Sequence, residues 1–492
     1  MGYLNAFVHP FHTISNYYIY DANTDSILTV NKNIYQYFSQ KDESALSNDD
    51  LALLNRFERQ GFLKSSQITK IEHPMTPLIP DILSRKVASI CLQVTQQCNL
   101  RCSYCIYSGN YFTRGHSSQK MTIETAKKGI DFLIKNSIDL NEVNVSFYGG
   151  EPLLMFHLIR DIVSYALEEA AGKKINFYIT TNGTIFNDEI IEFLEKHQFS
   201  VLISLDGPKE VHDKSRVFAA SGEGTFDFIM KNLSYVKKTA PNLYKRLMFN
   251  AVIDPSRDVN CSNEFFVQLE LEDLKKSTNY STLNPSYVKN ATEIPDSFYI
   301  NSEVDKFKAY LAAIRRYPVD KLQPLSFTML GQLYTPFVEH RRRTSEIPQA
   351  THPGGPCIPG ARRLFCNVSG NFYPCERVSE SSQITCIGNL EQGFNYERVV
   401  NLLNPARLTE EQCKKCWAIR FCTHCFAVCD DLEKLSKKMK QAECANTKMA
   451  CSQSLVDYTI LREFGCDFGQ KEQPVFAPYG GEHEKNHHGI SF

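Results

Sequence analysis

Residues 90–105 read ICLQVTQQCNLRCSYC, and this stretch decides how the rest of the chain is interpreted. It begins with a short apolar run that is typical of a buried strand in a parallel sheet. Three cysteines then follow within eight positions, in the spacing CxxxCxxC. A fully ligated iron-sulfur cubane takes four thiolates, so three close thiolates leave one iron open to a substrate or cofactor. On spacing alone, a zinc site with a distant fourth ligand and a set of buried structural cysteines stay open as alternatives.

Strand and helix patterns alternate from residue 88 to residue 253, which predicts a parallel sheet with helices on one face, open or closed into a complete or partial barrel. Each unusual motif lies at the end of an expected strand: CNLRCSYC, GGEP, TNGT and SLDG. Loops at the carboxyl ends of parallel strands are where such folds hold ligands. The expected strands are 90–95, 143–148, 175–180, 200–205 and 248–253, and the expected helices are 122–136, 157–170, 188–197 and 225–238.

Composition narrows the function classes. A chain of 492 residues with 42% hydrophobic content is expected to form two or three domains. The formal net charge of -1 argues against a nucleic-acid partner. The N-terminus lacks the pattern of a signal peptide and no apolar run is long enough for a membrane span, so we expect a cytoplasmic protein without a membrane partner. The 17 cysteines gather mainly in two clusters, which in an intracellular chain favours metal ligation over disulfides.

The flanking regions have different patterns. Residues 1–85 predict a small winged-helix-like module, with two strands over 16–30 and an amphipathic helix over 47–63. Residues 256–350 predict a helical connector, with a helix at 302–317. Residues 469–492 predict a flexible tail.

Together, CNLRCSYC, FYGGEPLL, TTNGT and SLDG resemble the radical S-adenosylmethionine (radical SAM) superfamily, over about residues 88–255. The resemblance implies an α/β fold with a partial (β/α)6 barrel at 86–255. It also implies that Cys98, Cys102 and Cys105 bind a [4Fe-4S] cluster whose open iron chelates S-adenosylmethionine.

The GGEP motif fits this resemblance. Gly149 and Gly150 allow close backbone approach, Glu151 offers an acceptor to the ammonium group of the cofactor, and Pro152 stiffens the exit. The plainer interpretation of this motif is a simple turn from strand to helix.

Four further residues are expected to bind the cofactor. The resemblance places Tyr104 against the adenine, whereas Asn182 and Ser204 are expected to hydrogen-bond the ribose or carboxylate. Arg216 is expected to pair with the carboxylate. Residues of these last three types near strand ends are also commonly solvated or structural.

The cysteines after residue 350 form a second pattern. Paired CxxC units favour zinc at first, but only five residues separate Cys416 from Cys422, too few for two zinc knuckles. The spacing instead resembles the SPASM extension of radical SAM enzymes, here at 351–468, and departs from it only in that the sixth ligand is either Cys425 or Cys429. The resemblance implies two auxiliary [4Fe-4S] clusters, one held by Cys357, Cys375 and Cys425 and one held by Cys413, Cys416, Cys422 and Cys444. Whether Cys366 or Cys429 completes the first cluster, or whether it keeps an open iron, stays open.

Radical SAM enzymes with this extension mostly modify peptides or proteins. Residues 1–85 resemble a PqqD-like precursor recognition element, which pairs an edge strand with a leader peptide. The whole chain therefore resembles maturases of ribosomally made peptides, especially those that form thioether cross-links of the sactipeptide and ranthipeptide type. Such an enzyme needs an external electron donor of the flavodoxin or ferredoxin type. The alternatives are a carbon-carbon cross-linking maturase, an anaerobic sulfatase-maturating enzyme and a metal-binding scaffold without activity.

Overall fold

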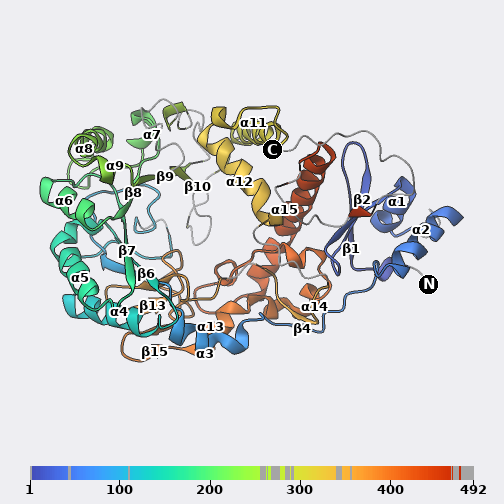
Figure 1. Ribbon diagram of the computed structural model, residues 1–492, viewed down its shortest axis with the longest axis horizontal. Helices are drawn as coiled ribbons and strands as arrows, with labels where there is room; N and C mark the ends of the chain where they lie inside the picture. Colours follow the sequence, from blue (N-terminus) through green and yellow to red (C-terminus); the bar gives the residue numbers. More distant parts are fainter. Residues whose placement is uncertain are drawn as a thin grey trace.

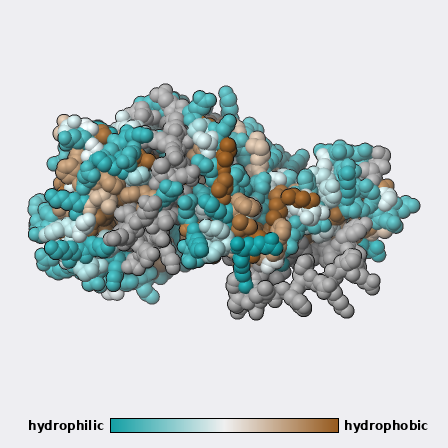
Figure 2. Space-filling model, turned by 90° about the horizontal axis from the view of Figure 1, so that it is seen from above, coloured by the Kyte–Doolittle hydropathy of each residue, from teal (hydrophilic) through white to brown (hydrophobic). Residues whose placement is uncertain are grey.

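The computed structural model is elongated, with a barrel at one end, a cysteine-rich domain in the middle and a small N-terminal module at the other end (Figure 1). Figure 2 shows a band of apolar side chains near the middle of one face. No helix in the described part of the chain is long and apolar enough to cross a membrane. The structure describes residues 3–42, 46–108, 111–254, 262, 264–266, 278–282, 289, 293–338, 346–354, 357–466, 468 and 476–477.

Six parallel strands form the barrel sheet, which the predicted α/β fold with a partial (β/α)6 barrel requires. Apolar residues alternate along β6, so that the side chains of Val143, Val145 and Phe147 are at most 1% exposed beneath the helices. The five expected strands are β5 (Ser89–Thr95), β6 (Glu142–Gly149), β7 (Lys174–Thr181), β8 (Ser200–Ser204) and β9 (Leu247–Ile253). The four expected helices are α4 (Ile123–Lys135), α5 (Phe156–Glu168), α6 (Asp188–Lys196) and α8 (Phe226–Thr239).

The sixth strand, β10 (Thr278–Thr282), pairs in parallel with β9 and lies beyond the expected barrel boundary at residue 255. The sequence TNYST has no apolar run, so the pattern that revealed the other strands is missing here. The region 256–350 is therefore not only a helical connector, because it completes the barrel. Its described helices are α11 (Asp296–Ala313), which begins before the expected residue 302, and α12 (Pro324–Val338).

The N-terminal module is a three-stranded antiparallel meander, β1 (Val8–His12), β2 (Tyr17–Asp21) and β3 (Ser26–Val30). Helices α1 (Lys32–Gln40) and α2 (Asn48–Arg59) cover one face, where Ile19 and Leu28 pack against Leu54 and Phe57. Helix α2 begins with a capping box in which Ser47 accepts from the Asp50 backbone and Asp50 accepts in return.

The other face of this meander packs on the C-terminal domain. Tyr20 and Ile27 share one hydrophobic core with Ile419 and Leu455, and His9 stacks on Trp417 with ring centroids 3.6 Å apart. Both faces of the small sheet are therefore buried. The segment after Leu63 leaves the module: β4 (Lys70–Ile71) pairs with β11 (Ala350–Thr351), and α3 (Ile79–Arg85) joins the barrel core.

The C-terminal domain shares its sheet with the barrel, because β12 (Leu364–Cys366) pairs in parallel with β5. Strands β13 (Asn371–Tyr373), β14 (Gly388–Asn389) and β15 (Gly393–Phe394) continue the sheet, and helices α13 (Tyr396–Leu403), α14 (Glu410–Cys413) and α15 (Lys437–Glu463) follow. Most of the expected flexible tail at 469–492 lies outside the described residues. Its described part, β16 (Phe476–Ala477), pairs with β3 at Ile27 and Leu28 and so is not a free segment.

Candidate active site and metal centres

The loop after β5 brings three buried thiols together. Backbone amides donate to two of the sulfurs, Leu100 N to Cys98 Sγ at 3.3 Å and Tyr107 N to Cys105 Sγ at 3.4 Å. Burial raises the pKa of Cys98 to about 12, and the neighbouring thiolates of Cys102 and Cys105 raise it further, although the amide of Leu100 opposes the shift. Three thiolates this close and this buried need positive charge beside them, which fits a bound metal cluster.

The spacing of these side chains is wider than a single ion needs. In the described part of the chain, no three Cys, His, Asp or Glu side chains are close enough to hold one metal ion. A cubane binds each thiolate through a different iron, so its ligands stand farther apart than those of tetrahedral zinc. Zinc and a cluster both stay open as alternatives at this stage.

The two glycines of GGEP bring the end of β6 against the cysteine loop. Gly149 has φ of +150°, and a Cβ on Gly150 would lie 2.0 Å from the carbonyl oxygen of Gln97. Gly150 N donates to Thr95 O at 2.9 Å, and Glu151 N donates to Gln97 O at 2.8 Å. Any side chain at these positions would push the loop away from the sheet, so GGEP is more than a simple turn.

Glu151 is fully buried and caps the short helix η4 (Pro152–Met155), with Pro152 as its first residue. Its carboxylate accepts from Leu153 N at 3.0 Å, Thr181 Oγ1 at 2.8 Å and Asn182 N at 2.7 Å. Burial raises the pKa of Glu151 to about 7, against the effect of these hydrogen bonds. A carboxylate has about four acceptor sites, so it retains capacity for one further donor such as an ammonium group.

A buried ion pair lies beside the second thiol. Arg216 donates from Nε to Asp206 Oδ2 at 3.0 Å and from Nη2 to Oδ1 at 3.2 Å, and its Nη1 lies 3.9 Å from Cys102 Sγ. Tyr104 donates its hydroxyl to Asp206, and its ring centroid is 5.3 Å from the guanidinium carbon. Although burial alone would raise it, the Arg216 charge holds the pKa of Asp206 below its usual range. The pair fixes both Arg216 and Tyr104 at the cysteine loop.

The two remaining predicted residues differ in their surroundings. Asn182, which directly follows β7, donates from Nδ2 to Asn99 Oδ1 at 2.8 Å, and its Nδ2 lies 3.9 Å from Cys98 Sγ. It therefore contacts the cysteine loop. Ser204 ends β8 and is half-buried, but its side chain makes no hydrogen bond among the described residues.

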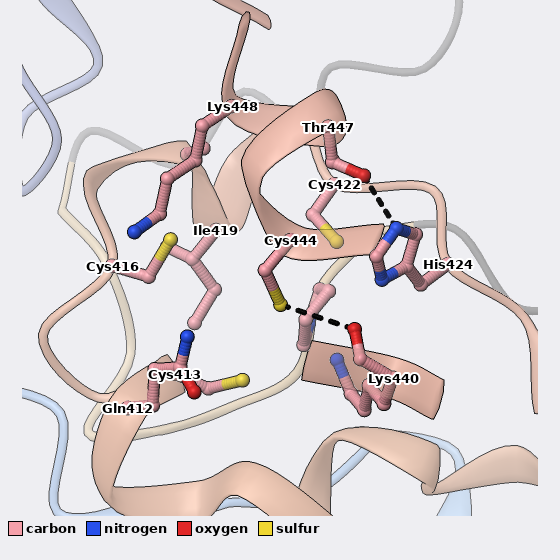
Figure 3. Close-up of a pocket in the computed structure, with 12 residues that line it drawn as sticks. Gln412, Cys413, Cys416, Ile419, Cys422, His424, Lys440, Cys444, Thr447 and Lys448 are labelled. Atoms are coloured by element: carbon pink, nitrogen blue, oxygen red, sulfur yellow. Dashed lines mark hydrogen bonds between the residues drawn. The ribbon is translucent and has the colours of Figure 1, made fainter. Parts of the chain in front are cut away.

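Four cysteines of the C-terminal domain line one cavity of about 390 Å³, part of it open to solvent. Their sulfurs point toward a common space between α14, the turn after it and the first part of α15 (Figure 3). His424, Lys440, Thr447 and Lys448 also line this cavity. The four cysteines are those expected for one auxiliary cluster, Cys413, Cys416, Cys422 and Cys444.

Comparison with known proteins agrees with the geometry of the barrel. The family described as the Radical SAM superfamily matches residues 92–252. This part of the chain is a radical SAM domain. This domain implies S-adenosylmethionine and a [4Fe-4S] cluster as its cofactors.

The chain is also similar to several curated proteins, of which three are described below. An uncharacterized protein from Methanocaldococcus jannaschii is 26% identical over 67% of this chain and 94% of its own length. The radical SAM cyclopropyl synthase TigE from Paramaledivibacter caminithermalis is 28% identical over 52% of this chain and 54% of its own length. A cysteine-type anaerobic sulfatase-maturating enzyme from Clostridium novyi is 33% identical over 29% of this chain and 38% of its own length. The chain thus spans only about half, or less, of the two relatives with a named activity.

Solved structures extend the similarity of the fold beyond the barrel. Native anSMEcpe with bound AdoMet has a TM-score of 0.54 and 20% identity, over 76% of this chain and 98% of that chain. The same protein with bound AdoMet and the Cp18Cys peptide has a TM-score of 0.52 and 18% identity, over 74% of this chain and 99% of that chain.

A second group of thiols in the C-terminal domain surrounds Cys357. Burial raises the pKa of Cys375, and the nearby charges of Glu376 and Cys357 raise it further. Burial likewise raises the pKa of Cys425, and Cys357 adds to the shift. Cys357 is therefore a neighbour of both Cys375 and Cys425. These three cysteines are the set expected for the first auxiliary cluster.

The two cysteines left open as completing ligands lie in different places. Cys366 is fully buried on β12. Burial raises the pKa of its thiol, and the nearby thiol of Cys91 on the adjacent strand adds to this shift. Cys366 is part of the apolar core of the barrel, beside Leu92. Cys429 is buried beside Cys425, Cys444 and Cys422, between the two groups of thiols. The geometry thus disfavours Cys366 as a ligand and leaves Cys429 within reach.

Sequence reasoning missed the residues that organise the Arg216 pair. Asp206 belongs to the quoted SLDG motif but was given no role, although it accepts from Arg216, from Tyr104 and from Val252 N at 3.1 Å. His212 is fully buried and accepts at Nδ1 from Asp206 N at 3.3 Å. Burial lowers the pKa of His212 to about 4, so it stays neutral and holds the Asp206 backbone. An acidic residue just after a strand, ten positions before an arginine, was the available signal.

Proposed function

We propose that this radical SAM enzyme matures a ribosomally made precursor peptide by forming thioether bonds from peptide cysteines to carbon atoms of acceptor residues. The observation that carries the proposal is the pairing of β12 with β5, which holds a cysteine-rich domain against the radical SAM barrel. A barrel that starts radical chemistry and a domain that gathers further thiol groups are combined in one rigid sheet.

The ligands we propose for the barrel cluster are Cys98, Cys102 and Cys105. When bound, the cluster and S-adenosylmethionine supply a carbon-centred radical that removes a hydrogen atom from the peptide. Glu151 accepts from the ammonium group of the cofactor through its remaining acceptor site. Arg216, held by Asp206, offers Nη1 toward the carboxylate, and Tyr104 borders the adenine.

For the auxiliary clusters we propose one ligand set at the cavity of Figure 3, Cys413, Cys416, Cys422 and Cys444, and a second set of Cys357, Cys375 and Cys425. Burial of each thiol disfavours its thiolate unless a cationic centre is present, so both sets fit metal-bound clusters. The barrel cluster would take one electron from an external donor of the flavodoxin or ferredoxin type. Forming the carbon-sulfur bond releases a proton and one further electron, which an auxiliary cluster would accept.

The N-terminal module is proposed to bind the leader of the precursor as an added strand. The outer side of β1 is occupied, because His9 of β1 stacks on Trp417 and lies 2.9 Å from Ser452 Oγ. Among the described residues, the outer edge of β3 pairs only with the two residues of β16. A leader strand therefore takes the edge of β3 in place of β16.

Removing the whole module is a poor test of this proposal, because Tyr20 and Ile27 belong to a core shared with the C-terminal domain. We instead compare the full chain with a variant that ends at residue 471 and lacks β16. Binding of a fluorescently labelled precursor is expected to become tighter in the shortened variant, while cofactor cleavage without peptide stays unchanged. Equal or weaker binding would show that the edge of β3 is not the leader site.

A second candidate function is the formation of carbon-carbon bonds in a peptide. It is favoured by the similarity to the cyclopropyl synthase TigE, which covers 52% of this chain. Sulfatase maturation has weaker support, because the match to the Clostridium novyi enzyme covers 29% of the chain. All of these candidate functions have a peptide as substrate. The structure of anSMEcpe with the bound Cp18Cys peptide supports this substrate class.

A further inference from the structure

The cavity lined by Cys413, Cys416, Cys422 and Cys444 contains a buried positive charge. Lys440 lies in the first turn of α15, lines this cavity, and has a side chain that is only 1% exposed. No described carboxylate or carbonyl group pairs with its ammonium group. Lys440 therefore lines the same cavity as the four cysteines and faces them with a positive charge.

The position of Lys440 in its helix is electrostatically unfavourable. A cation in the first turn opposes the helix dipole, whose N-terminal end is already partly positive. Lys440 therefore does not stabilise α15. Its charge instead acts on the thiols: burial raises the pKa of Cys422 to about 11, and a backbone hydrogen bond at His424 and the Lys440 charge act in the opposite direction. The same charge acts against the effect of burial on Cys429.

His424 also lines this cavity, and one of its two ring nitrogens lacks a partner among the described residues. His424 is 8% exposed, and its Nε2 pairs with the hydroxyl of Thr447, which donates to Glu443 O at 2.9 Å. The other ring nitrogen, Nδ1, is buried without a hydrogen bond among the described residues. Lys448, half-buried on the same helix, extends its ammonium group beside the sulfur of Cys416 (Figure 3). Lys440 and Lys448 thus both place positive charge at this cavity.

The other thiol group has different electrostatic surroundings. Glu376 follows Cys375 directly, and its charge raises the pKa of that thiol after the larger effect of burial. One carboxylate oxygen of Glu376, Oε2, is buried without a hydrogen bond, while Oε1 pairs with Arg363 at 2.7 Å. Arg363 and Arg377, which pair with Glu376, act to lower the pKa values of Cys375 and Cys425 against the larger effect of burial, so the charges at the Cys357 group are mixed, whereas Lys440 and Lys448 are both cations at the Cys413 group.

We propose that Lys440 sets the reduction potential of the cluster held by Cys413, Cys416, Cys422 and Cys444, and makes it the more easily reduced of the two auxiliary clusters. A [4Fe-4S] centre with four thiolates is an anion, and accepting one electron makes it more negative. A fixed cation beside it stabilises the reduced form more than the oxidised form, which raises the potential. Lys440 acts as a positioning charge and not as a ligand, and the proposal rests on the cluster assignment made under the proposed function.

The test is a redox titration followed by electron paramagnetic resonance on the full-length chain. A background of Cys98→Ala, Cys102→Ala and Cys105→Ala removes the barrel signal, so that only the auxiliary clusters are observed. Lys440→Met is expected to lower the potential of one signal, the same signal that disappears in Cys413→Ala with Cys416→Ala. The matched control is Lys438→Met, which removes an exposed lysine from the same helical turn and is expected to leave both potentials unchanged.

Each outcome has a separate meaning. Unchanged potentials in Lys440→Met, or an equal shift in Lys438→Met, would overturn the role of Lys440 while the cluster assignment stands. If Lys440→Met loses iron, Lys440→Arg decides: retained iron and potential support a requirement for charge, whereas loss in both variants would show that only the shape of lysine matters. Absence of any iron signal that depends on Cys413 and Cys416 would overturn the cluster assignment itself.

Discussion

Arg216 and Asp206 form an ion pair whose side chains are 8% and 3% exposed, and the pair lies against the sulfur of Cys102. Four described groups donate to the carboxylate of Asp206. Two are nitrogens of Arg216, and the others are the Tyr104 hydroxyl and the Val252 amide. The carboxylate therefore links three separate segments of the barrel mouth around the cysteine loop. This arrangement makes Asp206 a positioning residue for the groups we assign to cofactor binding.

Replacement of Asp206 by asparagine is expected to remove most cofactor cleavage. The Arg216 guanidinium would be left buried without its charge partner, which typically costs about 3–5 kcal/mol. Formation of 5′-deoxyadenosine measures the effect, and iron content shows whether the cluster survives. Lys214→Ala is the control, because Lys214 is exposed two positions from Arg216. Full cleavage activity in Asp206→Asn would remove Asp206 from this role.

Replacement of Gly150 by alanine is expected to disturb the cysteine loop. The new Cβ would lie 2.0 Å from the Gln97 carbonyl oxygen, and overpacking of this kind costs about 1–3 kcal/mol or more. Thermal unfolding and iron retention should both fall. Gly115→Ala is the matched control, since no atom lies within 4 Å of a Cβ built there. Equal stability of the two variants would contradict the close approach of GGEP to the loop.

The raised pKa of Glu151 predicts a pH dependence of stability in the cofactor-free protein. The folded pKa is about 7, above the ordinary value of 4.5. The folded state therefore holds the proton more tightly, so this contribution is complete below pH 4.5 and declines as the pH rises to about 7. The total is on the order of 3 kcal/mol. In Glu151→Gln this decline should be absent from denaturant midpoints, and parallel pH profiles of the two proteins would refute the assignment.

Removal of the barrel cysteines tests the division of iron among the sites. Three [4Fe-4S] clusters correspond to about twelve irons per chain, and Cys98→Ala, Cys102→Ala and Cys105→Ala together should leave about eight. Cofactor cleavage should be lost because only the barrel cluster has the cofactor beside it. Iron and sulfide assays after anaerobic reconstitution measure this, and stoichiometric zinc without iron would contradict all three assignments.

The barrel was predictable where its strands carry apolar runs, as in β5 and β6, since burial on both faces requires such runs. β10 was missed because TNYST is polar and its place in the sheet depends on pairing with β9. The expectation of a mobile tail likewise gave no indication of the pairing between β16 and β3.

The candidate site shows the same limit. The spacing of Cys98, Cys102 and Cys105 is local, so the sequence alone identified the group that the fold brings together. Cys366 looked equivalent to its neighbours in CIPGARRLFCNVSGNFYPC, and only its place on β12, beside Leu92 of β5, buries it in the barrel core. Lys440 was one lysine among several in KKMK, and its burial results from packing of α15 against the cysteine turn, which no local pattern encodes.

The most direct test of the central proposal is mass spectrometry of the reaction product. The enzyme is incubated with S-adenosylmethionine, a reductant and a cysteine-containing precursor encoded beside its gene, and the peptide is then treated with dithiothreitol and iodoacetamide. We predict that each cross-link removes a pair of hydrogens and one alkylatable cysteine, and that the link resists reduction. The same loss of mass with every cysteine still alkylated would show a carbon-carbon bond and contradict the assignment of thioether chemistry.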